Sequence, residues 1–160
     1  GFKMRVLYYD VIRKTDLEDR LGVEHEPLSE LLKESDIIFV AVPLNNATRG
    51  MIGEEEFALM KPAALLINVA RGPIVDHDAL VKALREGEIA GAGLDVFDQE
   101  PVPLDDPLLS LDNVVLTPHI ASNTIECRKH MARTAAEEVF RVLHGEQPRH
   151  AVNPEIAVRG

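Results

Sequence analysis

The sequence contains a single cysteine and no long apolar run. Cys127 cannot form a disulfide within the chain, which favours a reducing compartment and a cytoplasmic location. No apolar run approaches the roughly 20 residues that a membrane-spanning helix needs. The residues from Gly1 to Val6 also lack the layout of a secretory signal. We therefore expect no membrane partner.

Basic residues are outnumbered by acidic ones, at 17 against 27, so the net charge is −10. Nucleic-acid binding needs a basic face that neutralises phosphates, so we expect no nucleic-acid partner. The six histidines form no pattern of the HExxH type, and no second cysteine is available as a metal ligand. The sequence therefore predicts no metal site.

Short apolar runs alternate with amphipathic helical patterns along the 160 residues. This alternation predicts an α/β fold, a doubly wound parallel sheet with helices on both faces. Thr15 and Glu18 match a capping box. Leu28, Leu31 and Leu32 share one helical face, and residues 98–112 read as a loop with one short turn. Strands are expected at 4–9, 23–26, 37–42 (buried), 64–70 (buried), 90–97 and 114–117, and helices at 15–21, 54–60, 76–86 and 124–143.

Three short phrases each follow a strand-like run: 68–72 (NVARG), 95–101 (DVFDQEP) and 117–119 (TPH). Parallel sheets bind ligands outside the carboxyl ends of their strands, so these phrases are expected to form one site. Within the first phrase, the guanidinium of Arg71 can hold a carboxylate through two parallel hydrogen bonds. The alternative for Arg71 is a surface salt bridge.

Glu100 and His119 form an acid–base pair if the fold brings them together. A carboxylate bonded to imidazole favours the protonated ring and fixes its tautomer, which makes the histidine a competent acid near neutral pH. The alternatives are a solvated carboxylate in an acidic loop and a lone structural histidine.

Two aspartates at strand ends are candidate cofactor ligands. Asp10 lies where a dinucleotide fold holds the adenosine ribose, and its charge disfavours a 2′-phosphate, so it favours NAD over NADP. Nearby Arg13 leaves NADP open, and Asp10 has the alternative of a simple turn former. Asp95 can accept a hydrogen bond from a carboxamide, with a cap as its alternative.

In this order and spacing, the phrases resemble the D-isomer-specific 2-hydroxyacid dehydrogenases. The resemblance runs from Phe2 to about Pro154 and is most specific at 59–62 with 67–72, at 91–101 and at 112–122. It implies a Rossmann-like NAD-binding domain that transfers a hydride between nicotinamide and a small 2-oxo or 2-hydroxy acid.

The resemblance also implies a role for each site residue. Arg71 would bind the substrate carboxylate and carbonyl, His119 would be the general acid or base, and Glu100 would pair with His119 and raise its pKa. Asp10 would hold the adenosine ribose and Asp95 the nicotinamide carboxamide. The remaining cofactor contacts would come from Val42, Pro43, Val69, Ala70, Arg71, His119, Ile120 and Ala121, the last of which stands where relatives usually have glycine.

Within the family, Tyr8 and Tyr9 together with the closing stretch 152–155 look most like glyoxylate and hydroxypyruvate reductases. Phosphoglycerate dehydrogenases are the second choice, and the formate dehydrogenase branch is disfavoured because it carries glutamine in place of Glu100. A different alternative is an NAD(H)-sensing corepressor, which uses the same fold to recruit partners. Relatives are mostly dimers that pair through this domain, so we expect a homodimer, with the helix at 124–143 as a candidate contact.

The resemblance assigns residues 1–146 to a nucleotide-binding domain that is incomplete at its N-terminus, without its first strand and GxGxxG loop. Residues 147–160 would return to a substrate domain that the chain does not contain. A gap is then expected between the strands at 4–9 and 37–42, and we expect the chain to be a fragment of a longer protein. The alternatives are that these two strands close up or that a partner chain fills the gap. The isolated chain is expected to have little or no reductase activity.

Overall fold

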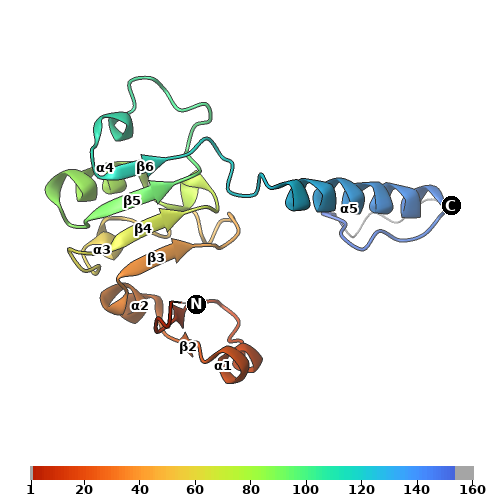
Figure 1. Ribbon diagram of the computed structural model, residues 1–160, viewed down its shortest axis with the longest axis horizontal. Coiled ribbons are helices and arrows are strands. Elements are labelled where there is room, and N and C mark those ends of the chain that lie inside the picture. The colour runs from red at the N-terminus through yellow and green to blue at the C-terminus, as the bar shows by residue number, and fades with distance from the viewer. Residues whose placement is uncertain (1, 154–160) are drawn as a thin grey trace. The chain divides into compact units, whose positions relative to one another are not determined.

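The computed structural model describes residues 2–153 and divides the chain into two units, Gly1–His119 and Ile120–Gly160. In the first unit, four parallel strands form one sheet in the order β3 (Ile37–Val40), β4 (Leu65–Asn68), β5 (Gly91–Leu94) and β6 (Val114–Leu116) (Figure 1). A separate parallel pair consists of β1 (Leu7–Tyr8) and β2 (Glu24–His25). The predicted α/β class with parallel strands is confirmed.

Helices connect these strands in the order that the sequence predicts. They are α1 (Thr15–Leu21), α2 (Leu28–Glu34), α3 (Glu54–Phe57) and α4 (His77–Glu86), with short 3₁₀ turns at Gly72–Ile74 and Pro107–Ser110. Helix α4 begins where the side chain of Asp76 accepts a hydrogen bond from the Ala79 N–H at 2.8 Å, and it ends at Gly87 with a φ of 72°. Its apolar stripe is buried against the sheet core.

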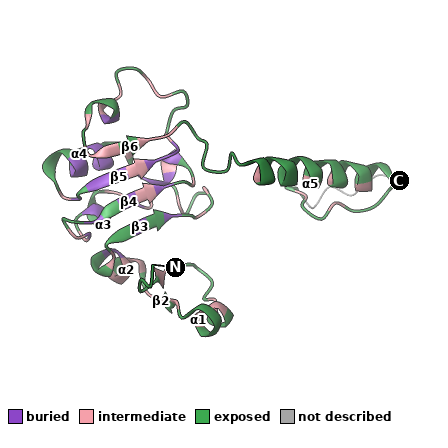
Figure 2. Ribbon diagram, in the orientation of Figure 1, coloured by how far each residue is buried: buried purple, intermediate pink, exposed green. Residues whose placement is uncertain are grey.

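Buried residues of the first unit gather in the four-stranded sheet and in helices α3 and α4 (Figure 2), and burial differs between the two faces of the sheet. Alternate residues such as Ile38, Val40 and Leu66 are buried in the core, together with Phe57 of α3. On the opposite face Phe39 is 66% exposed, and Ile37 and Leu65 are exposed as well. The sequence predicts a buried strand at 37–42, whereas in β3 only one side chain in two reaches the core.

Strands β1 and β3 remain apart, and a groove of about 880 Å³ lies between them. Among the described residues, β1 pairs only with β2 and β3 pairs only with β4. The alternative in which the two strands close up is therefore wrong. Each strand keeps one edge of backbone N–H and C=O groups outside the two ladders, and Val6 and Ile37 contribute apolar walls to the groove.

Several elements differ in detail from the sequence prediction. The capping box at Thr15 is wrong, because Thr15 is already the first helical residue and Lys14 precedes it without a side-chain cap. The carboxylate of Glu18 binds Arg13 and Tyr8 instead, so tertiary partners outcompete the local cap. Helix α3 ends at Phe57 rather than residue 60, and β3, β4 and β5 each pair over four residues.

The second unit is built on α5 (Ile125–Leu143). The Thr124 hydroxyl caps this helix by accepting from the Cys127 N–H at 3.1 Å, and the following segment returns along it through a 2.7 Å bond from the Arg149 N–H to Glu138. No residue of α5 is buried, and Phe140 and Leu143 are among its exposed apolar side chains. No helix within residues 2–153 is long and apolar enough to cross a membrane.

Candidate active site

The carboxyl ends of the strands bring the predicted site residues to one edge of the first unit. Arg71 follows β4, Asp95 follows β5 and His119 follows β6, and these three strands are parallel neighbours. The three phrases that the sequence singles out therefore lie beside one another, as parallel pairing requires.

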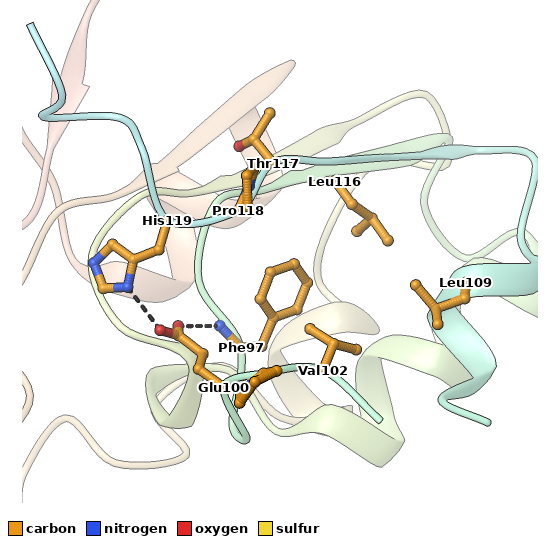
Figure 3. Close-up of a pocket in the computed structure, with 9 residues that line it drawn as sticks. Phe97, Glu100, Val102, Leu109, Leu116, Thr117, Pro118 and His119 are labelled. Atoms are coloured by element: carbon orange, nitrogen blue, oxygen red, sulfur yellow. Dashed lines mark hydrogen bonds and ion pairs between the residues drawn. The ribbon is translucent and has the colours of Figure 1, made fainter. Parts of the chain in front are cut away.

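Glu100 and His119 are in direct contact. His119 Nδ1 lies 2.8 Å from Glu100 Oε2, and Glu100 Oε1 accepts a 3.0 Å hydrogen bond from the Phe97 N–H (Figure 3). These two bonds, that from His119 first, hold the pKa of the Glu100 carboxyl below its ordinary value. The carboxylate is therefore ionised at neutral pH. Because it can only accept a hydrogen bond, it holds the ring of His119 with Nδ1 toward it.

The backbone of His119 is itself unusual. Its φ is 53°, in the left-handed region that residues other than glycine rarely adopt, and its N–H donates to the Thr117 carbonyl at 3.0 Å. Such a conformation costs on the order of 1 kcal/mol and persists where the surroundings enforce it, often at functional sites. The tight turn aims the imidazole at Glu100 as the chain leaves β6.

A buried asparagine shapes the turn that carries Arg71. Asn68 is 1% exposed, its Nδ2 donates to the Arg71 carbonyl at 3.0 Å, and its Oδ1 accepts from the Ala70 N–H at 3.0 Å. Both ends of the amide are thus used to close the loop after β4. The Arg71 guanidinium donates to the Ala70 carbonyl at 2.6 Å and is near enough to Glu100 to help lower the pKa of that carboxyl.

Gly72 holds the Arg71 turn against the segment that carries Glu100. A Cβ placed on Gly72 would lie 2.0 Å from the carbonyl carbon of Phe97 and 2.4 Å from the Asp98 nitrogen. Only glycine permits this backbone-to-backbone contact. The two loops are therefore positioned relative to each other by main chain rather than by side chains.

Asp95 is almost fully buried, with 4% of its surface exposed. Its Oδ1 accepts a 2.6 Å hydrogen bond from the Thr117 hydroxyl, and its backbone N–H donates to the Asn68 carbonyl at 3.0 Å. The carboxylate is thus oriented by β6 and anchored to β4. A buried and oriented acceptor at this edge suits a carboxamide donor.

A pocket of about 380 Å³ lies beside the Glu100–His119 pair (Figure 3). The carboxylate and imidazole stand at one end of it, and its other walls are mainly apolar side chains. These are Phe97, Pro101, Val102, Leu109, Leu116 and Pro118, with Thr117.

The other predicted cofactor residues are distributed along the same edge. Val69 is 40% exposed beside the half-buried Ala70, and Val42 is half-buried beside the exposed Pro43. These small and apolar surfaces, with the acceptor Asp95, fit the ring faces and polar groups of a dinucleotide.

Three predicted cofactor positions remain, Asp10 in the first unit and Ile120 and Ala121 in the second. The Asp10 carboxylate accepts from the Ile12 N–H at 3.0 Å, which is the turn-forming role that the sequence left open. Ile120 and Ala121 are exposed in the second unit, directly after His119.

Sequence reasoning assigned no role to Asn68 or Thr117, although both stand in the phrases it singled out. The signal that could have found them is a polar residue at the end of an apolar strand, where a buried side chain must find a hydrogen-bond partner. Within residues 2–153, no group of three or more histidine, cysteine and acidic side chains could hold a metal ion.

Comparison with known proteins shows which family the chain belongs to. Residues 1–121 match the model of the D-isomer specific 2-hydroxyacid dehydrogenase NAD binding domain. A glyoxylate reductase of Korarchaeum cryptofilum is 56% identical over 98% of this chain and 47% of its own length. The chain therefore spans about half the length of the curated relatives it matches.

Solved structures agree. The TT0316 protein of Thermus thermophilus superposes with a TM-score of 0.84 at 43% identity, over 94% of this chain and 47% of its own. A D-lactate dehydrogenase of Aquifex aeolicus, solved with NAD and lactic acid, superposes with a TM-score of 0.83 at 39% identity, over 91% of this chain and 48% of its own. The family match confirms both the predicted Rossmann-like fold and NAD as the cofactor of this domain type. The chain belongs to the D-isomer specific 2-hydroxyacid dehydrogenase family, as its NAD-binding domain.

Proposed function

We propose that the full-length protein, at the length of its relatives, reduces glyoxylate or hydroxypyruvate with NADH. The observation that carries this proposal is the 2.8 Å contact between His119 and Glu100 at the same sheet edge as Arg71. This arrangement supplies a proton donor, a charge that supports it and a cation for a substrate carboxylate. The identity to a glyoxylate reductase supports this choice of substrate class.

The role of each site residue follows from the side-chain atoms that can still bind substrate or cofactor. An ionised Glu100 can only accept, so the facing Nδ1 of His119 carries a hydrogen and Nε2 is the atom that gives up or takes the substrate proton. The Arg71 guanidinium would bind the substrate carboxylate and polarise its carbonyl. NADH, when bound, would supply the hydride to the carbonyl carbon. Asp95 would orient the nicotinamide carboxamide, and Asp10 the adenosine ribose.

A direct assay tests this function. Full-length protein mixed with NADH and either glyoxylate or hydroxypyruvate should oxidise the NADH, followed by its loss of absorbance. 3-Phosphoglycerate with NAD⁺ should give much slower turnover. If neither 2-oxo acid is reduced, the proposal is wrong, and faster turnover of the phosphorylated substrate would move the protein to the phosphoglycerate dehydrogenases.

Arg71→Lys should reduce kcat/KM for glyoxylate by about a hundredfold, because a lysine ammonium cannot make two parallel hydrogen bonds to a carboxylate. The loss should appear in steady-state kinetics as a raised KM for glyoxylate, while the KM for NADH stays within about twofold. Arg85→Lys, on the surface of α4, is the matched control. Equal effects in both variants would remove Arg71 from the site.

Glu100→Gln should move the high-pH limit of glyoxylate reduction down by about one pH unit, because reduction needs a protonated ring and the amide no longer stabilises that charge. In the natural protein the hydrogen bond from His119 and that from the Phe97 N–H lower the pKa of Glu100, so this carboxylate stays ionised below its ordinary range. Profiles of kcat/KM against pH for both proteins measure the shift. Asp105→Asn, in the same acidic loop, should leave the profile unchanged, and an unmoved limit in Glu100→Gln would contradict the pairing.

The proposal extends to domain organisation and assembly. Residues 1–146 would belong to the nucleotide-binding domain and 147–160 would lead to the substrate domain, so residues 1–160 alone should turn over glyoxylate slowly or not at all.

The groove between β1 and β3, with an open strand edge on each side, would take one further parallel strand of the full-length protein. The protein would be a cytoplasmic homodimer, and the exposed apolar residues of α5 support a contact there.

A further inference from the structure

An ion pair stands directly after the turn formed by Asp10. Arg13 Nε and Nη2 donate to the two carboxylate oxygens of Glu18 at 2.9 and 2.7 Å, and the Tyr8 hydroxyl donates to Glu18 Oε1 at 2.7 Å. The same hydroxyl accepts from the Lys14 N–H at 2.7 Å. Glu18 is therefore anchored to both β1 and the loop that follows it.

Two nitrogens of the Arg13 guanidinium are bonded to Glu18. The fork made by its Nε and one terminal nitrogen is filled by the two oxygens of Glu18, which is the strong bidentate arrangement. The Glu18 side chain is 17% exposed against 62% for Arg13, so the carboxylate end of the pair is the sheltered one. The bonds from Arg13 and Tyr8 lower the pKa of Glu18 to about 2, so the pair persists at all physiological pH values.

The place of this ion pair, after β1, bears on the choice between NAD and NADP. This inference rests on the proposed function. In dinucleotide folds a carboxylate after this strand faces the ribose 2′-hydroxyl, whereas an arginine nearby accommodates the 2′-phosphate of NADP. This chain has both groups, Asp10 and Arg13, three residues apart. Asp10, Arg13 and Glu18 together carry a net charge of −1, because Glu18 balances the charge of Arg13. This negative charge opposes a phosphate dianion.

We propose that Glu18 determines cofactor specificity by holding Arg13 in a bidentate ion pair and so withholding it from the 2′-phosphate of NADP. A phosphate that draws the Nε and Nη2 groups of Arg13 away must break two charge-assisted hydrogen bonds and remove the arginine partner of Glu18. NAD has no 2′-phosphate, so it binds without breaking these hydrogen bonds. Glu18 acts through Arg13, at a position that needs no contact with the cofactor.

Calorimetric titration with 2′,5′-ADP, the fragment of NADP that carries the 2′-phosphate, tests this in the full-length protein. Glu18→Gln keeps the shape of the side chain and removes its charge, so its affinity for 2′,5′-ADP should rise about tenfold, the value of one charge-assisted hydrogen bond. Affinity for 5′-AMP, which lacks the phosphate, should stay within about twofold. The ratio of kcat/KM for NADPH to that for NADH should rise in parallel.

Two controls isolate the ion pair. Asp19→Asn makes the same charge change at the next residue of α1 and should not raise 2′,5′-ADP affinity. Adding Arg13→Ala to Glu18→Gln should abolish the gain, and Arg13→Ala in the natural sequence should change 2′,5′-ADP affinity less than about twofold, because the arginine is already withheld. This last variant keeps the test decisive if Glu18→Gln does not fold.

The inference fails if Glu18→Gln leaves 2′,5′-ADP affinity unchanged, if Asp19→Asn raises it equally, or if Arg13→Ala alone lowers it severalfold. Each of these results leaves NADH-dependent glyoxylate turnover by the natural protein intact. Failure of the proposed function would instead appear as the absence of that turnover.

Discussion

His119→Asn is expected to lower kcat for glyoxylate reduction roughly 10²–10⁴-fold, the usual contribution of a positioned general acid. Asparagine is the sharpest replacement for two reasons. It tolerates the left-handed backbone that His119 adopts at a φ of 53°, so the turn after β6 can survive. It also keeps a side-chain hydrogen-bond donor while losing any group that can give up a proton near neutral pH.

His77→Asn provides the matched control for this variant. His77 also faces a carboxylate, with its Nε2 3.6 Å from Asp106 Oδ1, but at the start of α4. Its replacement should leave kcat within about twofold, and circular dichroism should show both variants folded. Direct titration with NADH should give near-natural affinity for His119→Asn. A variant that retains kcat within threefold of the natural value would exclude His119 as the acid.

The alternation of apolar and amphipathic segments was sufficient to predict the strands and helices of the first unit. The predicted strands at 64–70 and 90–97 are too long because each ladder ends where a polar residue is buried, at Asn68 and before Asp95. β4 stops pairing at Asn68, whose side chain then closes the loop that carries Arg71. Periodicity reports which residues are apolar, and it does not report where a ladder of hydrogen bonds ends.

The contact between Glu100 and His119 could be suggested by the sequence, but local patterns could not establish it. Nineteen residues separate the two, and the segment between them is a proline-rich loop with one 3₁₀ turn and a three-residue strand. Leu108 in that loop is buried in the hydrophobic core, so the loop is held by tertiary packing. Such a return is a property of the folded chain, and no short-range spacing encodes it.

The ion pair of Glu18 illustrates the opposite failure. A local rule assigned this residue to a helix cap, and the rule was wrong because Arg13 and Tyr8 offered stronger partners. The Arg13 guanidinium offers the Glu18 carboxylate two parallel hydrogen bonds and a full positive charge, whereas a capping bond would offer it a single backbone N–H. The sequence signal was present in the arginine five residues earlier, but no helical spacing pairs residues at that distance.

Gly72→Ala is expected to lower the free energy of unfolding by about 3 kcal/mol and kcat/KM for glyoxylate about a hundredfold. The added Cβ would stand 2.0 Å from the Phe97 carbonyl carbon and 2.2 Å from its oxygen. Both are backbone atoms, so no side-chain rotation relieves the overlap, and one loop must shift by about 1 Å or more to reach ordinary contact. A shift of that size separates Arg71 from Glu100.

Urea unfolding followed by circular dichroism, together with steady-state kinetics on the same preparations, measures both effects. Gly53→Ala is the matched control, because the nearest atom to its Cβ is a Glu56 side-chain oxygen at 3.6 Å, and its cost should stay below about 1 kcal/mol. If Gly72→Ala changes stability by less than this and activity by less than threefold, the two loops are not locked by their backbones. If stability falls and kcat/KM does not, the contact supports the fold without setting the distance between Arg71 and the acid–base pair.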